Sequence, residues 1–295
     1  MWEKSPSLYS LGSVSSDNPR DGDFELVTLR NGARAVRHLG HGEVMHPSIG
    51  PWKEALRLYV EQPQLAERLA QPGPPWVVLD VGLGAATNAV AALTCARALG
   101  AGRRRPLEVI SLEVDLAPLR LALADPEGFP FLQPFRGAAE GLMRDGHWAE
   151  EGLRWRLLLG DAVPHLEGAL PPADLVYFDP FSPASNPEMW TEAVLARVRA
   201  RCQEAGEGAR LLTYSAATPT RVTLLLAGFY VGAGVSTGTK GETTVAATRL
   251  EALEAPLGAR WLERWRRSSS RAPHGAALTP EVESRLLAHP QWHSR

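Results

Sequence analysis

Residues 174–191 read DLVYFDPFSPASNPEMWT, and no other stretch of the chain says as much about the fold. The apolar run at 174–178 is typical of a buried strand, and Asp179, Pro180 and Phe181 follow it directly. In open α/β sheets ligands bind at the carboxyl ends of the strands, so we expect these three residues at a ligand-binding edge. The carboxylate and the Pro180 carbonyl can accept hydrogen bonds from an amine, and the Phe181 ring offers a face to a flat or cationic group. The segment favours group transfer to nitrogen over hydrolysis.

Strands and helices alternate on both sides of that segment. The sequence predicts strands over 76–81, 107–112, 154–159, 174–178 and 210–214. It predicts helices over 86–99, 116–124, 188–202 and 219–227. This alternation is typical of a parallel sheet covered on both faces. Two more stretches, 230–236 and 243–248, flank a short turn and are expected to pair antiparallel. The expected fold is therefore α/β: a Rossmann-like sheet of seven strands with a terminal antiparallel hairpin, which resembles the class I methyltransferase sheet.

Other elements are expected before and after this sheet. The stretches 24–29 and 33–39 flank Asn31-Gly32 and predict a β-hairpin, because both turn positions need positive φ. Residues 51–70 predict a helix with a proline in its first turn. The last part of the chain, from residue 250, is basic and predicts one or two short helices that pack on the domain or on a partner.

Composition sets broad bounds. The chain has 295 residues, 44% hydrophobic and 22% charged, as in an ordinary globular protein, and its net charge of −2 gives no overall basic character for nucleic-acid binding. Its two cysteines, Cys95 and Cys202, predict neither a disulfide framework nor a metal site. No run approaches the roughly 18 apolar residues of a membrane span. We expect a soluble, cytoplasmic protein without a metal or a membrane segment.

Acidic residues stand at the ends of the first four predicted strands: Asp80, Glu113, Asp161 and Asp179. Because the carboxyl ends of parallel strands share one edge, we expect these carboxylates to converge on one cavity. Glu113 has the spacing of a carboxylate that binds ribose hydroxyls, and Asp161 is expected within reach of an adenine amino group. Any one of them alone is also consistent with a helix N-cap.

The loop DVGLGAATN at 80–88 narrows the choice of cofactor. Its small residues Gly82 and Gly84 let the backbone pass close to a ligand, and Ala86 is expected to be helical already. The loop has no basic residue to meet a pyrophosphate, and the chain has no P-loop motif. S-adenosylmethionine carries a sulfonium and an ammonium group but no phosphate. A site rich in carboxylates therefore favours S-adenosylmethionine over NAD or ATP.

Three segments of the chain and its cofactor loop resemble a known family. Residues 174–191 resemble the signature of the methyltransferase component of the MnmC/MnmD family. The matching residues are Asp179, Phe181, Ser182, Pro183, Asn186, Pro187, Met189 and Trp190. The cofactor loop is similar at Gly82, Gly84 and Asn88. The segment 41–56 is similar at Glu43, His46, Gly50, Glu54 and Ala55, and 237–248 resembles the basic final hairpin of the family through Lys240.

This resemblance, over roughly residues 24–248, implies a function. The family makes 5-methylaminomethyl-2-thiouridine at the wobble position of certain tRNAs, so the implied activity is S-adenosylmethionine-dependent methylation of the 5-aminomethyl group, with tRNA as the partner. The implied domains are an extension at 1–75, a methyltransferase domain at 76–250 and a tail at 251–295. The flavin oxidase domain of the bifunctional members is not expected in this chain.

The resemblance also implies roles for residues. Asp179 would orient the amine and take its proton; a helix cap or a contact with the cofactor ammonium, without proton transfer, stays open for it. The Pro180 carbonyl would accept a second hydrogen bond. Phe181 or Trp190 would stack on the base, and Trp190 is equally consistent with a core anchor. Further substrate contacts are assigned to His46 and Lys240. The implied cofactor contacts are Asp80, Gly82, Gly84, Asn88, Glu113, Asp161 and Asp179.

Two other classes of function stay open on the sequence. One is a methyltransferase or polyamine-synthase-like transferase that acts on a small amine, which the acidic net charge favours. The other is a fold that binds the cofactor or a partner protein without catalysis.

Overall fold

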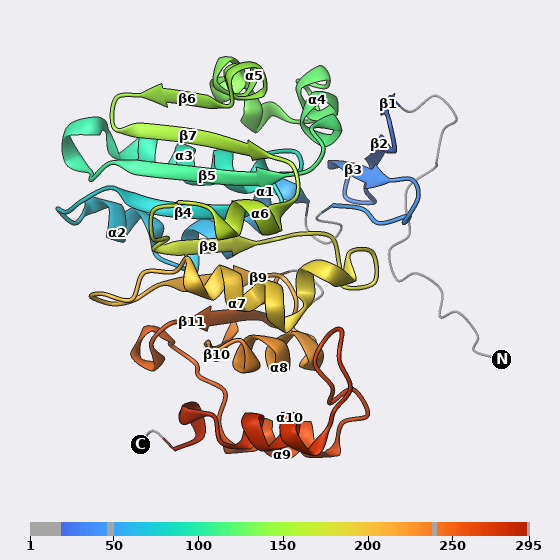
Figure 1. Ribbon diagram of the computed structural model, residues 1–295. Helices are drawn as coiled ribbons and strands as arrows, with labels where there is room; N and C mark the ends of the chain where they lie inside the picture. The colour runs from blue at the N-terminus through green and yellow to red at the C-terminus, as the bar shows by residue number, and fades with distance from the viewer. Residues whose placement is uncertain (1–18, 46–49, 238–240, 294–295) are drawn as a thin grey trace.

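The computed structural model describes residues 19–45, 50–237 and 241–293. In this part of the chain the main sheet has eight strands (Figure 1). They are β4 (Trp76–Val81), β5 (Leu107–Glu113), β6 (His147–Glu150), β7 (Leu153–Leu159), β8 (Leu175–Phe178), β9 (Arg210–Thr213), β10 (Tyr230–Gly234) and β11 (Thr243–Ala247). Their order is β10-β11-β9-β8-β4-β5-β7-β6. The order reverses at β4, so the cleft for a ligand is expected at its carboxyl end.

Helices cover both faces of this sheet (Figure 1). One face carries α1 (Pro51–Ala55), α2 (Leu65–Ala70), α3 (Thr87–Leu99), α4 (Ala117–Ala124) and α5 (Arg136–Asp145). The other carries α6 (Ala162–Glu167), α7 (Glu192–Ala200), α8 (Thr218–Leu226), α9 (Ala259–Arg267) and α10 (Pro280–Leu287). In β4, Val78 packs on the α3 side, whereas Val77 and Leu79 pack on the α7 side. This alternation explains the near-continuous apolar run of the strand.

The predicted sheet is confirmed in its core and corrected at one edge. The five predicted strands pair in parallel, and β10 and β11 form the antiparallel pair that was expected at the end. The expected count of seven was wrong, because β6 adds an antiparallel strand beside β7. The four residues of β6 read HWAE and are mostly exposed, so this strand has no apolar alternation to reveal it.

Two predicted helices are interrupted. The helix expected over 51–70 is divided into α1, a π-helical segment over Leu56–Glu61 and α2. Between the last two lie Pro63, which has no backbone N–H to continue a helix, and Gln64, which takes a left-handed conformation with φ of 55°. The helix expected over 188–202 is divided at Thr191, whose side chain caps α7 by accepting from the backbone N–H of Val194.

The N-terminal hairpin is confirmed and lies beside the carboxyl ends of β5 and β7 (Figure 1). Strands β2 (Phe24–Thr28) and β3 (Arg34–His38) pair antiparallel, and the short strand β1 (Arg20–Asp21) joins β2. The hairpin is held on the main body through α4. The Arg34 guanidinium donates to Asp125 at 2.8 Å, just beyond the end of that helix. The N-terminal segment therefore comes close to the edge at which a ligand is expected.

The C-terminal helices pack on the same body. Trp261 and Trp265 of α9 and Leu286 of α10 are buried in the core on the α7 side. Gln291 donates from Nε2 to the carbonyls of Val231 and Leu257, which ties the end of the chain to β10. The expected short helices are present. The domain boundaries predicted above stay a prediction.

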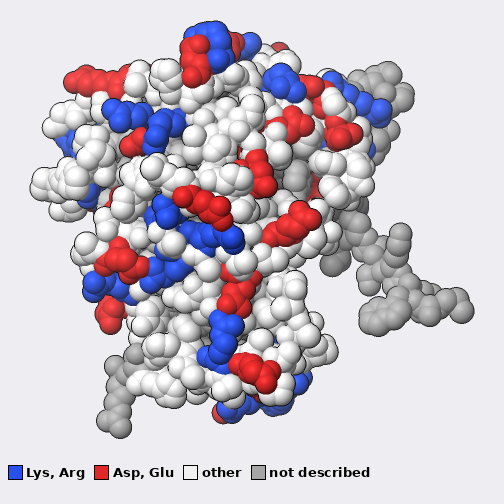
Figure 2. Space-filling view, in the orientation of Figure 1, with Lys and Arg blue, Asp and Glu red and all other residues white. Residues whose placement is uncertain are grey.

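Charges of both signs are interspersed on the face shown in Figure 2. Many arginines of the described residues have an acidic partner; for example, Arg197 pairs with Glu167 at 2.7 Å and Arg285 pairs with Glu192 at 2.5 Å. Within the three described ranges, no helix has the length and apolar character needed to cross a membrane.

Candidate active site

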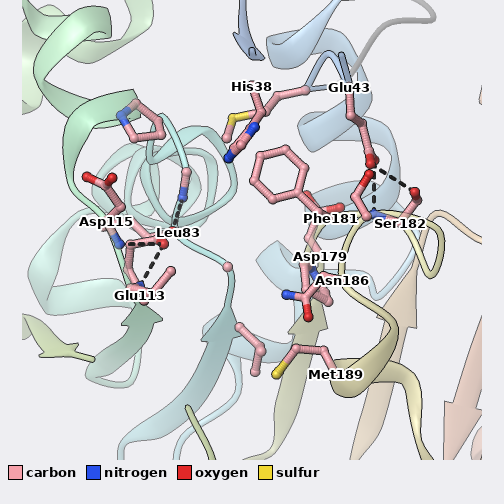
Figure 3. Close-up of a pocket in the computed structure, with 18 of the residues that line it drawn as sticks. His38, Glu43, Leu83, Glu113, Asp115, Asp179, Phe181, Ser182, Asn186 and Met189 are labelled. Carbon is pink, nitrogen blue, oxygen red and sulfur yellow. Dashed lines mark hydrogen bonds between the residues drawn. The ribbon is translucent and has the colours of Figure 1, made fainter. Parts of the chain in front are cut away.

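A cavity of about 1060 Å³ opens at the carboxyl edge of the sheet (Figure 3). Four of its lining segments directly follow strands β4, β5, β7 and β8. A fifth comes from the N-terminal hairpin and the residues after it, 38–45. The cavity therefore lies at the reversal of the strand order, where sheets of this kind bind ligands.

The charged side chains that line this cavity are mostly acidic. Eight acidic residues line it: Asp23, Glu43, Glu54, Glu113, Asp115, Asp161, Asp179 and Glu188. Among the described residues no lysine or arginine lines it, and the basic side chains of the lining are the two histidines His38 and His41. An enclosed surface with charges of one sign concentrates counter-ions, so this cavity favours a positively charged ligand. No group of three or more His, Cys, Asp or Glu side chains in the described ranges is placed to hold a metal ion.

The glycine loop after β4 forms the floor of the cavity. Gly82 has φ of 92°, and a Cβ there would lie 2.7 Å from the carbonyl oxygen of Asp179. Gly84 has φ of 53°, and its Cβ would lie 3.2 Å from Sδ of Met45. Only glycine meets both the positive φ and the close approach at position 82. Ala86 was expected to be helical, but it precedes α3 in a left-handed conformation with φ of 61°.

Glu113 is fixed against this loop. Its carboxylate accepts from the backbone N–H groups of Gly84 at 2.8 Å, Val114 at 2.7 Å and Asp115 at 3.1 Å (Figure 3). Burial raises the pKa of Glu113 above its ordinary value, although these three hydrogen bonds act in the opposite direction. The sequence correctly placed this carboxylate beside the glycine loop.

Asp179 begins the loop after β8 and points into the cavity (Figure 3). Its Oδ2 accepts from the Asn88 amide at 2.7 Å. The hydroxyl of Tyr59 lies nearby: burial raises its pKa well above the usual range, and the charges of Asp179 and Glu54 raise it further. Asp179 is thus a carboxylate oriented by an amide, next to a phenol that stays protonated.

Two residues predicted to contact the cofactor do not line the cavity. Asp80 is fully buried and accepts from the Ser111 hydroxyl at 2.7 Å. Its side chain alternates with those of Leu79 and Val81, so it points toward the α3 side of the sheet. Asn88 is also buried, and its amide supports Asp179. The prediction of four converging carboxylates is therefore corrected to three.

Asp161, the third of these carboxylates, also serves the fold. It lines the cavity, and its Oδ1 accepts from the backbone N–H of Val163 at 3.0 Å as the N-cap of α6. Both interpretations that the sequence allowed are compatible with this position. Its contact with an adenine group stays a prediction.

The structure places the predicted substrate-binding residues in different environments. Phe181 and Pro180 line the cavity, and the Pro180 carbonyl already accepts from the Tyr214 hydroxyl at 3.3 Å. Trp190 is fully buried, and its Nε1 donates to the Phe181 carbonyl at 2.8 Å. Of the two roles that the sequence left open for Trp190, the structure supports the core anchor and not the base stacker, since its ring packs edge-on against Phe178 in the core. Two other predicted residues, His46 and Lys240, lie outside the described residues.

The N-terminal hairpin contributes contacts that sequence reasoning missed. Glu43 accepts from both the backbone N–H of Ser182 at 2.9 Å and its hydroxyl at 2.8 Å (Figure 3). His38 lines the cavity beside Phe181. For Glu43 the family resemblance was the available signal, whereas nothing in the sequence pattern placed His38 near the loop after β8.

Comparisons with known proteins agree with this geometry. A family model described as S-adenosyl-L-methionine-dependent methyltransferase matches residues 136–249. The "tRNA 5-methylaminomethyl-2-thiouridine biosynthesis bifunctional protein MnmC" of Paracidovorax citrulli is 36% identical over 163 residues, 53% of this chain and 25% of that protein. The protein of the same name from Methylibium petroleiphilum is 29% identical over 269 residues, 85% of this chain and 39% of that protein.

A solved structure extends the match to most of the chain. MnmC2 from Aquifex aeolicus superposes with a TM-score of 0.70 and 27% sequence identity, over 93% of this chain and 86% of that one. Over most of its length the chain is similar to S-adenosylmethionine-dependent methyltransferases of the MnmC/MnmD type. It spans between 25% and 39% of the length of the two curated relatives described above.

The cavity fits the cofactor of this family, S-adenosylmethionine. Gly82 and Gly84 line the cavity without side chains, so the loop leaves space for a ligand directly against its backbone. Glu113 presents a buried carboxylate beside that space, and the lining acids match a ligand that carries two positive charges. The described lining contains no lysine or arginine that would pair with a phosphate.

Proposed function

We propose that this protein methylates a primary amine, the 5-aminomethyl group of wobble 2-thiouridine in tRNA. The single observation that carries the proposal is the position of Asp179: a carboxylate oriented by Asn88, directly at the glycine loop, in a cavity lined by acids. The names of the MnmC relatives support tRNA as the substrate.

In this proposal the cofactor lies along the glycine loop. Glu113 would accept from the ribose hydroxyls, and Asp161 would lie toward the adenine. When bound, S-adenosylmethionine supplies an electrophilic methyl group on a sulfonium. The carbonyl of Asp179 approaches Gly82 so closely that the loop and the end of β8 form one surface. A ligand on the glycine loop would therefore lie next to the Asp179 side chain.

The proposed role of Asp179 follows from the chemistry of amines. An alkylamine is mostly protonated near neutral pH, and it attacks only after it loses a proton. The Asp179 carboxylate would accept a hydrogen bond from the ammonium group, orient it and take the proton. Asn88 holds the carboxylate in place at 2.7 Å. Orientation contributes much of the rate in such transfers, so this support matters as much as the charge.

A direct assay tests this function. The purified protein is incubated with labelled S-adenosylmethionine and tRNA from cells that lack the protein, and the nucleosides are separated after digestion. The proposal expects label in 5-methylaminomethyl-2-thiouridine alone. Absence of label from tRNA, with cofactor binding intact, would contradict it.

A second candidate is methylation of a small aliphatic amine. It is favoured by the lining of the cavity, which has eight acids and, in the described ranges, no lysine or arginine to meet an RNA phosphate. The same assay with spermidine in place of tRNA separates the two, since a small-amine enzyme would label spermidine and leave tRNA unlabelled.

A further inference from the structure

Three aromatic rings from distant parts of the chain form one wall of the cavity. Phe24 and His38 are direct cross-strand partners in the β2–β3 hairpin, with ring centroids 4.8 Å apart. Phe181, from the loop after β8, lies nearly parallel to Phe24 at 6.3 Å and edge-on to His38 at 5.5 Å. All three line the cavity, and Figure 3 shows His38 and Phe181 directed into it. We call these three rings the aromatic wall.

The His38 ring has a fixed orientation. Its Nδ1 accepts from the backbone N–H of His41 at 3.3 Å, so the neutral imidazole carries its proton on Nε2. Gly40 packs against the same edge of the ring, since a Cβ there would lie 3.2 Å from Cε1 and 3.5 Å from Nδ1 of His38. The ring therefore presents a single N–H donor to the cavity.

The charge of His38 is also defined by its surroundings. Burial lowers its pKa, and the neighbouring His41 lowers it further, while the acids Asp23, Asp115 and Glu43 act in the opposite direction. The lowered pKa favours the neutral form of the ring. A neutral imidazole can lie next to an ammonium or sulfonium group without charge repulsion.

We propose that the aromatic wall is a binding subsite for a planar heterocycle with a ring carbonyl, which packs against Phe181 and accepts a hydrogen bond from Nε2–H of His38. This inference rests on the proposed function and assigns His38 as the residue that distinguishes an amine carried on such a ring from an aliphatic amine. A pyrimidine has the flat face and the carbonyl oxygen that this wall complements. An aliphatic polyamine has neither, so the wall would select against it.

The test measures binding of 5-aminomethyluridine and of n-butylamine to the full chain in the presence of S-adenosylhomocysteine. His38→Phe keeps a ring beside Phe181 and removes the donor. We expect it to weaken nucleoside binding about tenfold, the size of one neutral hydrogen bond, and to leave n-butylamine binding within about twofold. His38→Gln keeps an N–H near Nε2 and should restore most of the affinity. His147→Phe, on exposed β6 outside the cavity lining, is the matched control.

The outcomes are separable. Nucleoside binding that is unchanged in His38→Phe, equal losses for both ligands, or no nucleoside binding by the wild type would each overturn the subsite. If His38→Phe does not fold, Phe181→Leu removes the ring face instead and should weaken the nucleoside selectively. Selective nucleoside binding without methyl transfer to tRNA would reject the proposed function and keep the subsite. Methyl transfer to tRNA, with nucleoside binding unchanged in His38→Phe, would reject the subsite and keep the proposed function.

Discussion

The two sides of the cavity are built in different ways. The donor side, where the methyl donor is expected, is formed by the glycine loop and Glu113. It is held by a hydrogen bond from the backbone N–H of Gly84 to the Glu113 carboxylate, 29 residues away. The acceptor side, formed by the hairpin and the loop after β8, is held by side chains 139 residues apart, as in the pair Glu43 and Ser182. The donor side is therefore a local property of two neighbouring βα units. The acceptor side exists only after the hairpin has packed on the sheet.

The largest expected effect is on the rate of methyl transfer. It distinguishes the two sides because kcat and cofactor affinity respond to different substitutions. Asp179→Ala removes the proposed proton acceptor, so we expect kcat for methyl transfer to fall by about 10²- to 10⁴-fold. Cofactor affinity, measured by calorimetry, should stay within a few-fold. Asp161→Ala is the matched change on the donor side and should weaken cofactor binding while kcat at saturation is kept. If both variants lowered only cofactor affinity, the proposed role of Asp179 would be wrong.

The next effect probes the junction between the two sides. Gly82→Ala places a methyl group 2.7 Å from the Asp179 carbonyl at φ of 92°, so the backbone has to move. We expect it to lower the free energy of unfolding by about 3 kcal/mol and to weaken cofactor binding. Gly84→Ala meets only the flexible Met45 side chain and should cost about 1 kcal/mol. Denaturant unfolding of both variants checks this, and equal losses would refute the close approach at Gly82.

The acceptor side is tested through its hairpin. Glu43→Ala removes the acceptor of two hydrogen bonds from Ser182, so the loop after β8 keeps only its aromatic contacts with the hairpin. We expect KM for the amine substrate to rise about tenfold, with cofactor affinity unchanged. Ser182→Ala loses one of the two bonds and should show a smaller rise, about threefold. A change in cofactor affinity in either variant would mean that the two sides are not independent.

The smallest effect is a pH dependence on the donor side. Burial raises the pKa of Glu113, so as the pH falls from neutral this carboxyl takes up its proton earlier than an ordinary glutamate. A protonated carboxyl accepts hydrogen bonds poorly, so cofactor affinity should fall, about twofold when the pH equals this pKa. Glu113→Gln should bind more weakly and without this pH dependence. An affinity in the wild type that is flat down to the ordinary glutamate range would contradict the assignment.

The same contrast explains what the sequence could reveal. Gly82, Gly84 and Glu113 were predictable because their spacing and their positions at strand ends are local signals. The burial of Asp80 was open to prediction too, since alternation along β4 puts it on the face opposite Leu79 and Val81. The aromatic wall could not be predicted, because no local sequence pattern indicates where the β2–β3 hairpin packs. The exposed strand β6 was missed for lack of apolar alternation, and the burial of Trp190 depends on the packing of residues beyond 260.

A crystal structure with S-adenosylhomocysteine and 5-aminomethyluridine tests the central claim most directly. We expect the ribose of the cofactor at Glu113, its sulfur above the glycine loop, and the amine of the nucleoside between that sulfur and the Asp179 carboxylate. A nucleoside bound outside this cavity, or an amine directed away from Asp179, would contradict it.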